Sequence, residues 1–266
     1  NLVSSMRNAI SFVEDTGAFD QFSLDVLGND ILNAADDGVE ADFCFHNCRI
    51  MRNRLTNTFV ALSAQPTLGG PTYFVRNVAY NVAHVAFKLY RGSTGDVIVN
   101  NTVVKSGDAF GNYASRPVSN LYLRNNLFIG GPGGTYGGYE NGTGRVFDVG
   151  TLDLASVDAD HDGYGSTTGT FVFRWGDVAT ATGLPAMRAT TTEAHAVEVT
   201  MATFASGVAH PANPLTVFTP PDLRPSGGGA AIDAGVGIAN LTDSVTGTAP
   251  AVGASEVGAA VPAYGP

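Results

Sequence analysis

Short runs of alternating apolar and polar residues recur through the first half of the chain, and many of them end at an asparagine. These asparagines are 24 residues apart: Asn29, Asn53, Asn77, Asn101 and Asn125. The apolar residues three positions earlier recur with them: Val26, Ile50, Phe74, Ile98 and Tyr122. A period of this length is too short for paired helices and is typical of one coil of a β-solenoid, whose equivalent residues stack about 4.8 Å apart.

Asparagine suits the turn at the end of such a strand because it tolerates left-handed backbone geometry. Its side-chain amide also bonds to the amides above and below. We therefore expect Asn53, Asn77 and Asn101 to be buried in an asparagine ladder.

A second set of alternating runs follows the asparagines, at residues 37–42, 60–65 and 86–91. Their alternation predicts strands with one face in the core and the other in water. Aligning them places Glu40, Ser63 and Lys88 in one outward row. The neighbouring row then holds Asp42, Gln65 and Tyr90.

The predicted fold is all-β: a right-handed parallel β-helix of about 24 residues per coil over residues 1–131, with an incomplete N-terminal coil. Beyond residue 131 the repeat fades. Residues 132–266 are predicted to form a loop-rich C-terminal extension with one short helix within 177–195 and a terminal β segment. Unpaired strand edges at the first coil need a cover, so we expect an upstream segment or a partner chain to cap them.

Composition narrows the choice of partners. The chain has 14 basic and 24 acidic residues, a net charge of −10, and two lysines, Lys88 and Lys105. Such a chain is a poor candidate for binding nucleic acid or anionic lipid, and no apolar run is long enough for a membrane span. Cys44 and Cys48 either pair in an oxidising compartment or remain buried thiols.

The acidic segment at residues 36–42 is the first candidate site. Glu40 and Asp42 share the outward face about 6.5–7 Å apart by strand rise. This separation suits the two carboxylates of an inverting hydrolase and also a cation site. Asp37 is a candidate for substrate binding, together with Gln65 and Tyr90. The alternative is that Asp37 and Gly38 only form a turn.

Cationic residues lie on the same stacked surface. Lys88 and Arg91 are candidates for the base and charge neutraliser that lyases of uronic acid polymers require. The alternative for Lys88 is a structural ion pair with Glu40. No histidine pair has zinc-like spacing. His46 is the histidine that we select as a candidate acid or base, because it lies in the turn beside the acidic segment.

A calcium-loop pattern, D-x-D-x-D-G, begins at Asp158 and includes Asp160 and Asp162. Position 12 of this loop is Gly169, so the usual bidentate glutamate is missing. The pattern predicts Ca²⁺ at the three aspartates, or else a structural turn.

The segments DDGVEAD, NRLTN, SAQPTLGGPTYFVRNVAYN, NNTVV, GGGAAIDAG and PAVGASEVG carry a family resemblance. They resemble the bacterial right-handed parallel β-helix repeat family of the pectate lyase-like superfamily, although Ala251 stands where that family usually has Asp. The resemblance implies a bacterial extracellular or cell-surface protein. Relatives of this architecture include polysaccharide lyases, hydrolases, epimerases, tailspikes and adhesins.

We therefore expect a secreted protein that binds or acts on a polysaccharide or cell-surface glycan, and if it is an enzyme, a lyase or hydrolase of acidic glycans. The alternative is a non-catalytic cell-surface, adhesin or assembly scaffold.

Overall fold

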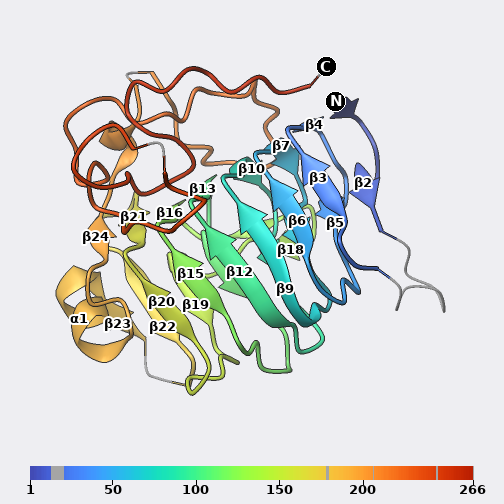
Figure 1. The fold of residues 1–266 in the computed structure, drawn as a ribbon, viewed down its shortest axis with the longest axis horizontal. Coiled ribbons are helices and arrows are strands. Elements are labelled where there is room, and N and C mark those ends of the chain that lie inside the picture. Colours follow the sequence, from blue (N-terminus) through green and yellow to red (C-terminus); the bar gives the residue numbers. More distant parts are fainter. Residues whose placement is uncertain (13–20, 178–179, 206, 244, 266) are drawn as a thin grey trace.

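The computed structural model describes residues 1–12, 21–177, 180–205, 207–243 and 245–265. It forms a parallel β-helix of about seven turns with about 25 residues per turn (Figure 1). The predicted solenoid is confirmed. Within the described residues, no helix is long and apolar enough to cross a membrane.

Successive coils contribute strands to four parallel stacks. The eight-stranded sheet contains, in order, β1 (Leu2–Ser4), β4 (Asp30–Leu32), β7 (Arg54–Thr58), β10 (Val78–Val82), β13 (Thr102–Val104), β16 (Leu127–Gly130), β21 (Gly163–Ser166) and β24 (Val197–Glu198). The six-stranded sheet contains β3 (Asp25–Leu27), β6 (Cys48–Met51), β9 (Leu68–Val75), β12 (Thr94–Val99), β15 (Tyr122–Arg124) and β20 (Asp158–Asp160), and it faces the viewer in Figure 1.

The third side of the solenoid consists of two four-stranded sheets. One contains β2 (Ile10–Ser11), β5 (Asp37–Glu40), β8 (Val60–Ser63) and β11 (Phe87–Lys88). The other contains β14 (Phe110–Asn112), β19 (Phe147–Val149), β22 (Val172–Trp175) and the antiparallel β23 (Ala181–Thr182).

The core runs along the solenoid axis, where inward side chains of successive coils stack. Phe87 lies 5.4 Å from Phe110 between ring centroids, Phe110 lies 5.0 Å from Phe147, and Phe147 lies 4.6 Å from Trp175. All four rings are at most 2% exposed. The large apolar area that such rings remove from water is the main stabilising contribution of the coils.

The asparagine ladder is confirmed for Asn29, Asn53, Asn77 and Asn101. Asn77 donates its backbone N–H and its side-chain amide to Oδ1 of Asn101, at 2.9 and 3.0 Å. The next rung is Asn126, not the predicted Asn125, because this coil is one residue longer. The same shift pairs Leu123, instead of Tyr122, with Ile98.

The 24-residue repeat fades because the following coil carries an insertion, not because the solenoid ends at residue 131. Asp162 takes the next rung, 36 residues after Asn126. The insertion includes the hairpin of β17 (Thr135–Tyr136) and β18 (Tyr139–Glu140). The insertion is anchored to the solenoid by the buried Lys105. Its ammonium group donates hydrogen bonds to the carbonyl oxygens of Ser106, Asp108 and Asn141.

The expected short helix is α1 (Gly183–Thr190), which lies within the predicted 177–195 segment. The predicted terminal β segment is not found: the described residues after Glu198 contain a 3-10 helix at Met201–Thr203 and an isolated bridge between Phe204 and Pro225, but no strand. Glycine-rich and proline-rich sequence there favours turns over a ladder.

The C-terminal tail covers the eight-stranded sheet and returns toward the first coil, so the two termini lie close together (Figure 1). A second asparagine stack, Asn33–Asn57–Asn81, binds this tail. Asn57 accepts the backbone N–H of Phe218 and donates to its carbonyl, at 3.0 and 2.9 Å. The tail therefore protects one outer face, while the six-stranded sheet keeps part of its outer face open.

Candidate functional site

The stacked row predicted on the second strand of each coil is confirmed by the sheet register. Glu40 pairs with Ser63, and Ser63 pairs with Lys88, across neighbouring parallel strands. Ser11 of β2 extends the row beyond Glu40. These four residues alternate with core residues such as Leu62, so they lie on the outer face of the sheet. This face is not in water as predicted, because Glu40 and Ser63 are buried.

Lys88 forms its ion pair with Asp37, not with Glu40. Lys88 Nζ lies 2.7 Å from Asp37 Oδ2, and Asp37 is 1% exposed. Burial raises the pKa of Asp37 to about 6, although Lys88 opposes this shift. Burial lowers the pKa of Lys88, but the ion pair outweighs it and raises that pKa above its usual value. The Lys88 side chain is therefore a protonated ammonium group in an ion pair, and it is not a neutral amine that could accept a proton.

Glu40 and Asp42 are both buried and have separate partners. Glu40 Oε2 accepts hydrogen bonds from Asn8 Nδ2 and Ser11 Oγ, at 2.5 and 2.6 Å. Asp42 accepts from Ser63 Oγ at 2.5 Å and from Gln65 Nε2 at 3.3 Å. These bonds link adjacent coils, which is a structural use of the two carboxylates.

Arg91, Gln65 and Tyr90 come together at the corner that follows β8 and β11. With Arg116 and Ser115 they line an open cavity of about 500 Å³. Burial raises the pKa of Tyr90 to about 12, so its hydroxyl is neutral at ordinary pH, and it contacts His84 Nε2 at 3.4 Å. Gln65 adds a side-chain amide, so the cavity combines cationic and neutral hydrogen-bonding groups.

The charge of this cavity contrasts with that of the chain. Of the described residues, no acidic side chain lines it, whereas the whole chain carries a net charge of −10. Arg91 and Arg116 are both exposed, and neither pairs with a carboxylate among the described residues. Seven other arginines do pair with aspartates: Arg7, Arg49, Arg54, Arg124, Arg145, Arg174 and Arg224. The cavity is thus suited to an anion.

His46 lies in a different environment from the carboxylates. Its ring is exposed and contacts Phe22 and Phe45, with centroids 5.2 and 5.7 Å away. Among the described residues, no hydrogen bond or ion pair joins it to the acidic segment. Nearby, Cys44 and Cys48 form a disulfide, which resolves the choice left open by the sequence.

The three aspartates of the calcium-loop pattern have different partners. Asp158 pairs with Arg124, and Asp160 accepts hydrogen bonds from His195. Asp162 is buried as the last rung of the asparagine ladder, beside Glu193, whose Oε2 accepts the Asp162 backbone N–H. Burial and the charge of Glu193 raise the pKa of Asp162 well above its usual range.

A histidine pair that the sequence did not reveal lies at the same place. The rings of His161 and His195 stack with centroids 4.5 Å apart, and the Nδ1 atom of each ring contacts the same Asp160 oxygen, Oδ2. The two histidines are 34 positions apart, and the intervening β21, β22 and α1 bring them together. No local motif signals such a long-range pair.

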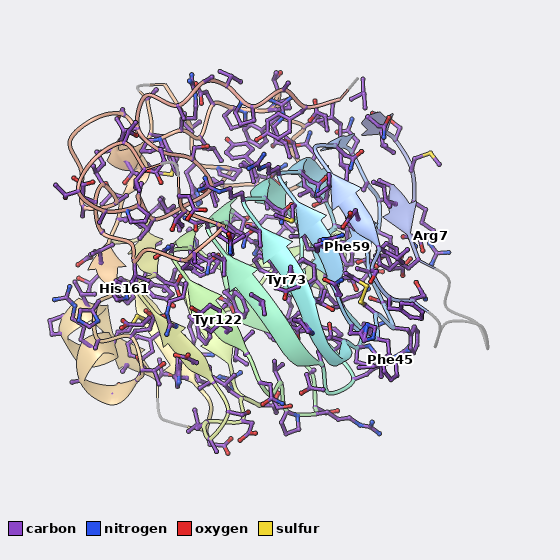
Figure 2. The ribbon with its side chains drawn as sticks, viewed as in Figure 1. Arg7, Phe45, Phe59, Tyr73, Tyr122 and His161 are labelled. Carbon is purple, nitrogen blue, oxygen red and sulfur yellow. A yellow bond between two sulfur atoms is a disulfide. The ribbon has the colours of Figure 1, made fainter. Side chains whose placement is uncertain are left out.

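Two outward tyrosines on the six-stranded sheet were also missed. Tyr73 on β9 and Tyr122 on β15 each pair with Val97 of the strand between them, and both are half-buried (Figure 2). They are two strands apart, which corresponds to about 10 Å. The Arg124 guanidinium lies 4.6 Å from the Tyr122 ring centroid and holds that ring in place.

Comparison of this chain with known protein families, characterised proteins and solved structures found no match. The class of this protein is therefore described from its own fold and cavity. It is a parallel β-helix protein with a cationic corner cavity.

Proposed function

We propose that this chain is a secreted, non-catalytic β-helix module that binds an acidic polysaccharide. The cavity lined by Arg91, Arg116, Gln65 and Tyr90 carries the proposal, because it gathers two arginines that form no ion pair within the described residues of an acidic chain. Arginine forks match carboxylate geometry, and the amide and phenol suit sugar hydroxyls. Every sugar unit of a uronic acid polymer carries both a carboxylate and hydroxyl groups.

The neighbouring surface suits a long ligand. Tyr73 and Tyr122 project from an open sheet face at a separation comparable to that of alternate rings in an extended pyranose chain. Aromatic faces and sugar rings associate through apolar contact. The Cys44–Cys48 disulfide supports secretion, because disulfides persist in oxidising compartments.

The ion-paired state of Lys88 favours binding over catalysis. A general base must be free to take a proton, whereas Lys88 is held by Asp37 at 2.7 Å. Glu40 and Asp42 are likewise engaged with side chains of adjacent coils. The same observation supports a non-catalytic module over a lyase or hydrolase.

Affinity electrophoresis and calorimetry with polygalacturonate, alginate and a neutral dextran test the proposal. We expect binding to the two acidic polymers, weakening as salt is raised, and at least tenfold loss in Arg91→Gln/Arg116→Gln. Arg7→Gln, an exposed arginine on the first coil, is the matched control and keeps wild-type affinity. Equal affinity of the double variant would overturn the proposed site.

The enzyme alternative is tested in the same samples by the ultraviolet absorbance of unsaturated ends and by a reducing-end assay. Binding without product supports the module. Product formation that is lost in Lys88→Met, while circular dichroism shows that the variant is folded, would replace the proposal with a lyase or hydrolase that uses Lys88.

A second proposed function is assembly, favoured by the edge strands of the first coil. Leu2, Phe22 and Leu27 are 61%, 50% and 53% exposed there. Strand edges that are unpaired among the described residues and carry apolar side chains are templates for a further coil, which a partner chain would supply. Light scattering across a concentration series tests this: association that Leu27→Lys abolishes supports it, and a monomer at every concentration contradicts it.

A further inference from the structure

Three metal-ligating side chains meet at the last strand of the six-stranded sheet. Asp160 ends β20, His161 follows it (Figure 2), and His195 comes from the segment between α1 and β24. One potential ligand atom of each lies within 4.8 Å of the other two. Asp160 Oδ2 is 2.7 Å from His195 Nδ1 and 3.4 Å from His161 Nδ1.

The backbone orients the carboxylate toward the two imidazoles. Asp160 Oδ1 accepts the backbone N–H of His161 at 2.9 Å and that of His195 at 2.7 Å. Its other oxygen, Oδ2, is then directed at both rings. Hydrogen bonds that fix a ligand in this way are a common second layer of metal sites.

The coil geometry fixes His161 as well. His161 has φ 62°, and the residues that precede other rungs of the ladder, Arg76 and Asn100, have φ 55° and 54°. Its Nδ1 atom is buried and has no hydrogen-bond partner within the described part of the chain. A buried polar atom without a partner calls for a ligand, and here it faces the Asp160 carboxylate.

We propose that Asp160, His161 and His195 bind a divalent transition-metal ion of the Zn²⁺ class. Ligands about 2.0–2.1 Å from a tetrahedral ion lie about 3.3 Å apart, so the His161 contact already fits. The closer His195 contact opens by a small movement of a side chain that is 64% exposed, which also leaves a position for water.

The ligand set selects the class of metal. Two imidazoles and one carboxylate suit Zn²⁺, Co²⁺ or Ni²⁺, whereas Ca²⁺ takes six to eight oxygen ligands. Asp158 and Asp162 are not part of this set, because they are bound to Arg124 and Asn126. The ion would tie β20 to the segment after α1, the helix whose buried Met187 joins the core. This inference does not depend on the proposed glycan binding.

The test uses the untagged protein stripped with EDTA. Calorimetry with Zn²⁺ should give one equivalent at micromolar or tighter affinity, the melting temperature should rise with Zn²⁺ as linkage requires, and Co²⁺ should give visible d–d absorption. His195→Gln and His161→Asn should each weaken binding at least tenfold. Asparagine is chosen at position 161 because it tolerates positive φ. His46→Gln, which alters an exposed histidine outside the cluster, should bind like the wild type.

Circular dichroism of each variant without metal confirms folding before the comparison. Absence of one-equivalent binding in the wild type, or unchanged affinity in folded His195→Gln, would overturn the proposal. Stabilisation by Ca²⁺ but not by Zn²⁺ or Co²⁺ would also overturn it, in favour of the oxygen ligands of the aspartate pattern.

Discussion

Asp162 accepts two hydrogen bonds from Asn126 through one oxygen, Oδ1, from the backbone N–H at 2.6 Å and from the side-chain amide at 2.9 Å. It thus occupies the rung where the ladder would otherwise continue with an asparagine. A carboxyl group at this position is buried beside Glu193, and burial together with the charge of Glu193 raises the pKa of Asp162 well above its usual range.

Asp162→Asn should raise the free energy of unfolding at pH 8 by about 1–3 kcal/mol, because an amide keeps the ladder bond and removes a buried carboxylate. The pKa of Asp162 is raised in the folded state, so its contribution to stability falls as pH rises through that pKa. The gain should therefore be small at pH 4. Urea unfolding of both proteins at pH 4 and pH 8 measures it, and a loss of stability at both pH values would contradict the prediction.

Asn77→Leu should lower the free energy of unfolding by about 3 kcal/mol, because several buried groups lose their partners. The donors of Asn53 and the carbonyl of Ile50 depend on the Asn77 amide. Urea unfolding is the measurement. The control is Asn213→Leu, which alters an exposed asparagine; equal effects in the two variants would argue against the ladder as a source of stability.

Lys88→Met should destabilise the fold by about 3–5 kcal/mol at pH 8, because it leaves the buried Asp37 carboxylate without its partner. The pKa of Asp37 is already raised to about 6, and stability from this group falls as pH rises from about 4 through 6. Loss of Lys88 raises that pKa further, so the effect should shrink at pH 4.

The double variant Asp37→Asn/Lys88→Met should recover most of the stability at pH 8, since no buried charge remains. Thermal and urea unfolding of the wild type, the two single variants and the double variant completes the cycle. A double variant that is as unstable as Lys88→Met would show that packing, not charge pairing, is the function of the lysine side chain.

Asp96→Asn should stabilise the protein by up to about 3 kcal/mol at pH 8. Asp96 is fully buried on β12, and burial raises its pKa to about 6 although Thr67 donates a hydrogen bond at 2.6 Å. Because the pKa of Asp96 is raised in the folded state, the free energy of unfolding of the wild type falls as pH rises through 6. The Asp96→Asn variant has no such ionisation and shows no such fall. The difference in unfolding free energy should therefore appear between pH 4 and pH 7; a pH-independent difference would exclude ionisation as its cause.

The sequence alone determined the solenoid and much of the first candidate row. A 24-residue spacing of asparagines fixes which residues stack, because successive coils differ by one strand spacing. The alternation of apolar and polar residues then fixes which side chains face outward. Glu40, Ser63 and Lys88 could be aligned for this reason before any coordinates were known.

The prediction of stacked residues from the 24-residue period failed where the length of a coil changes. An extra residue moved the rung from Asn125 to Asn126, and the inserted hairpin hid the continuation of the coils beyond residue 131. Stacking depends on the number of residues per coil, so a single insertion shifts every later alignment. Strands with no regular spacing, such as β21 and β24, were placed by core packing and backbone pairing alone.

The tertiary structure also decided which charged groups are engaged and which are available. Lys88 reaches Asp37, 51 positions away, and Arg91 meets Arg116 at a corner formed by different coils. His161 and His195 meet because the intervening strands and α1 fold back to the same edge. Such contacts depend on side-chain reach and loop paths, which the 24-residue period does not encode.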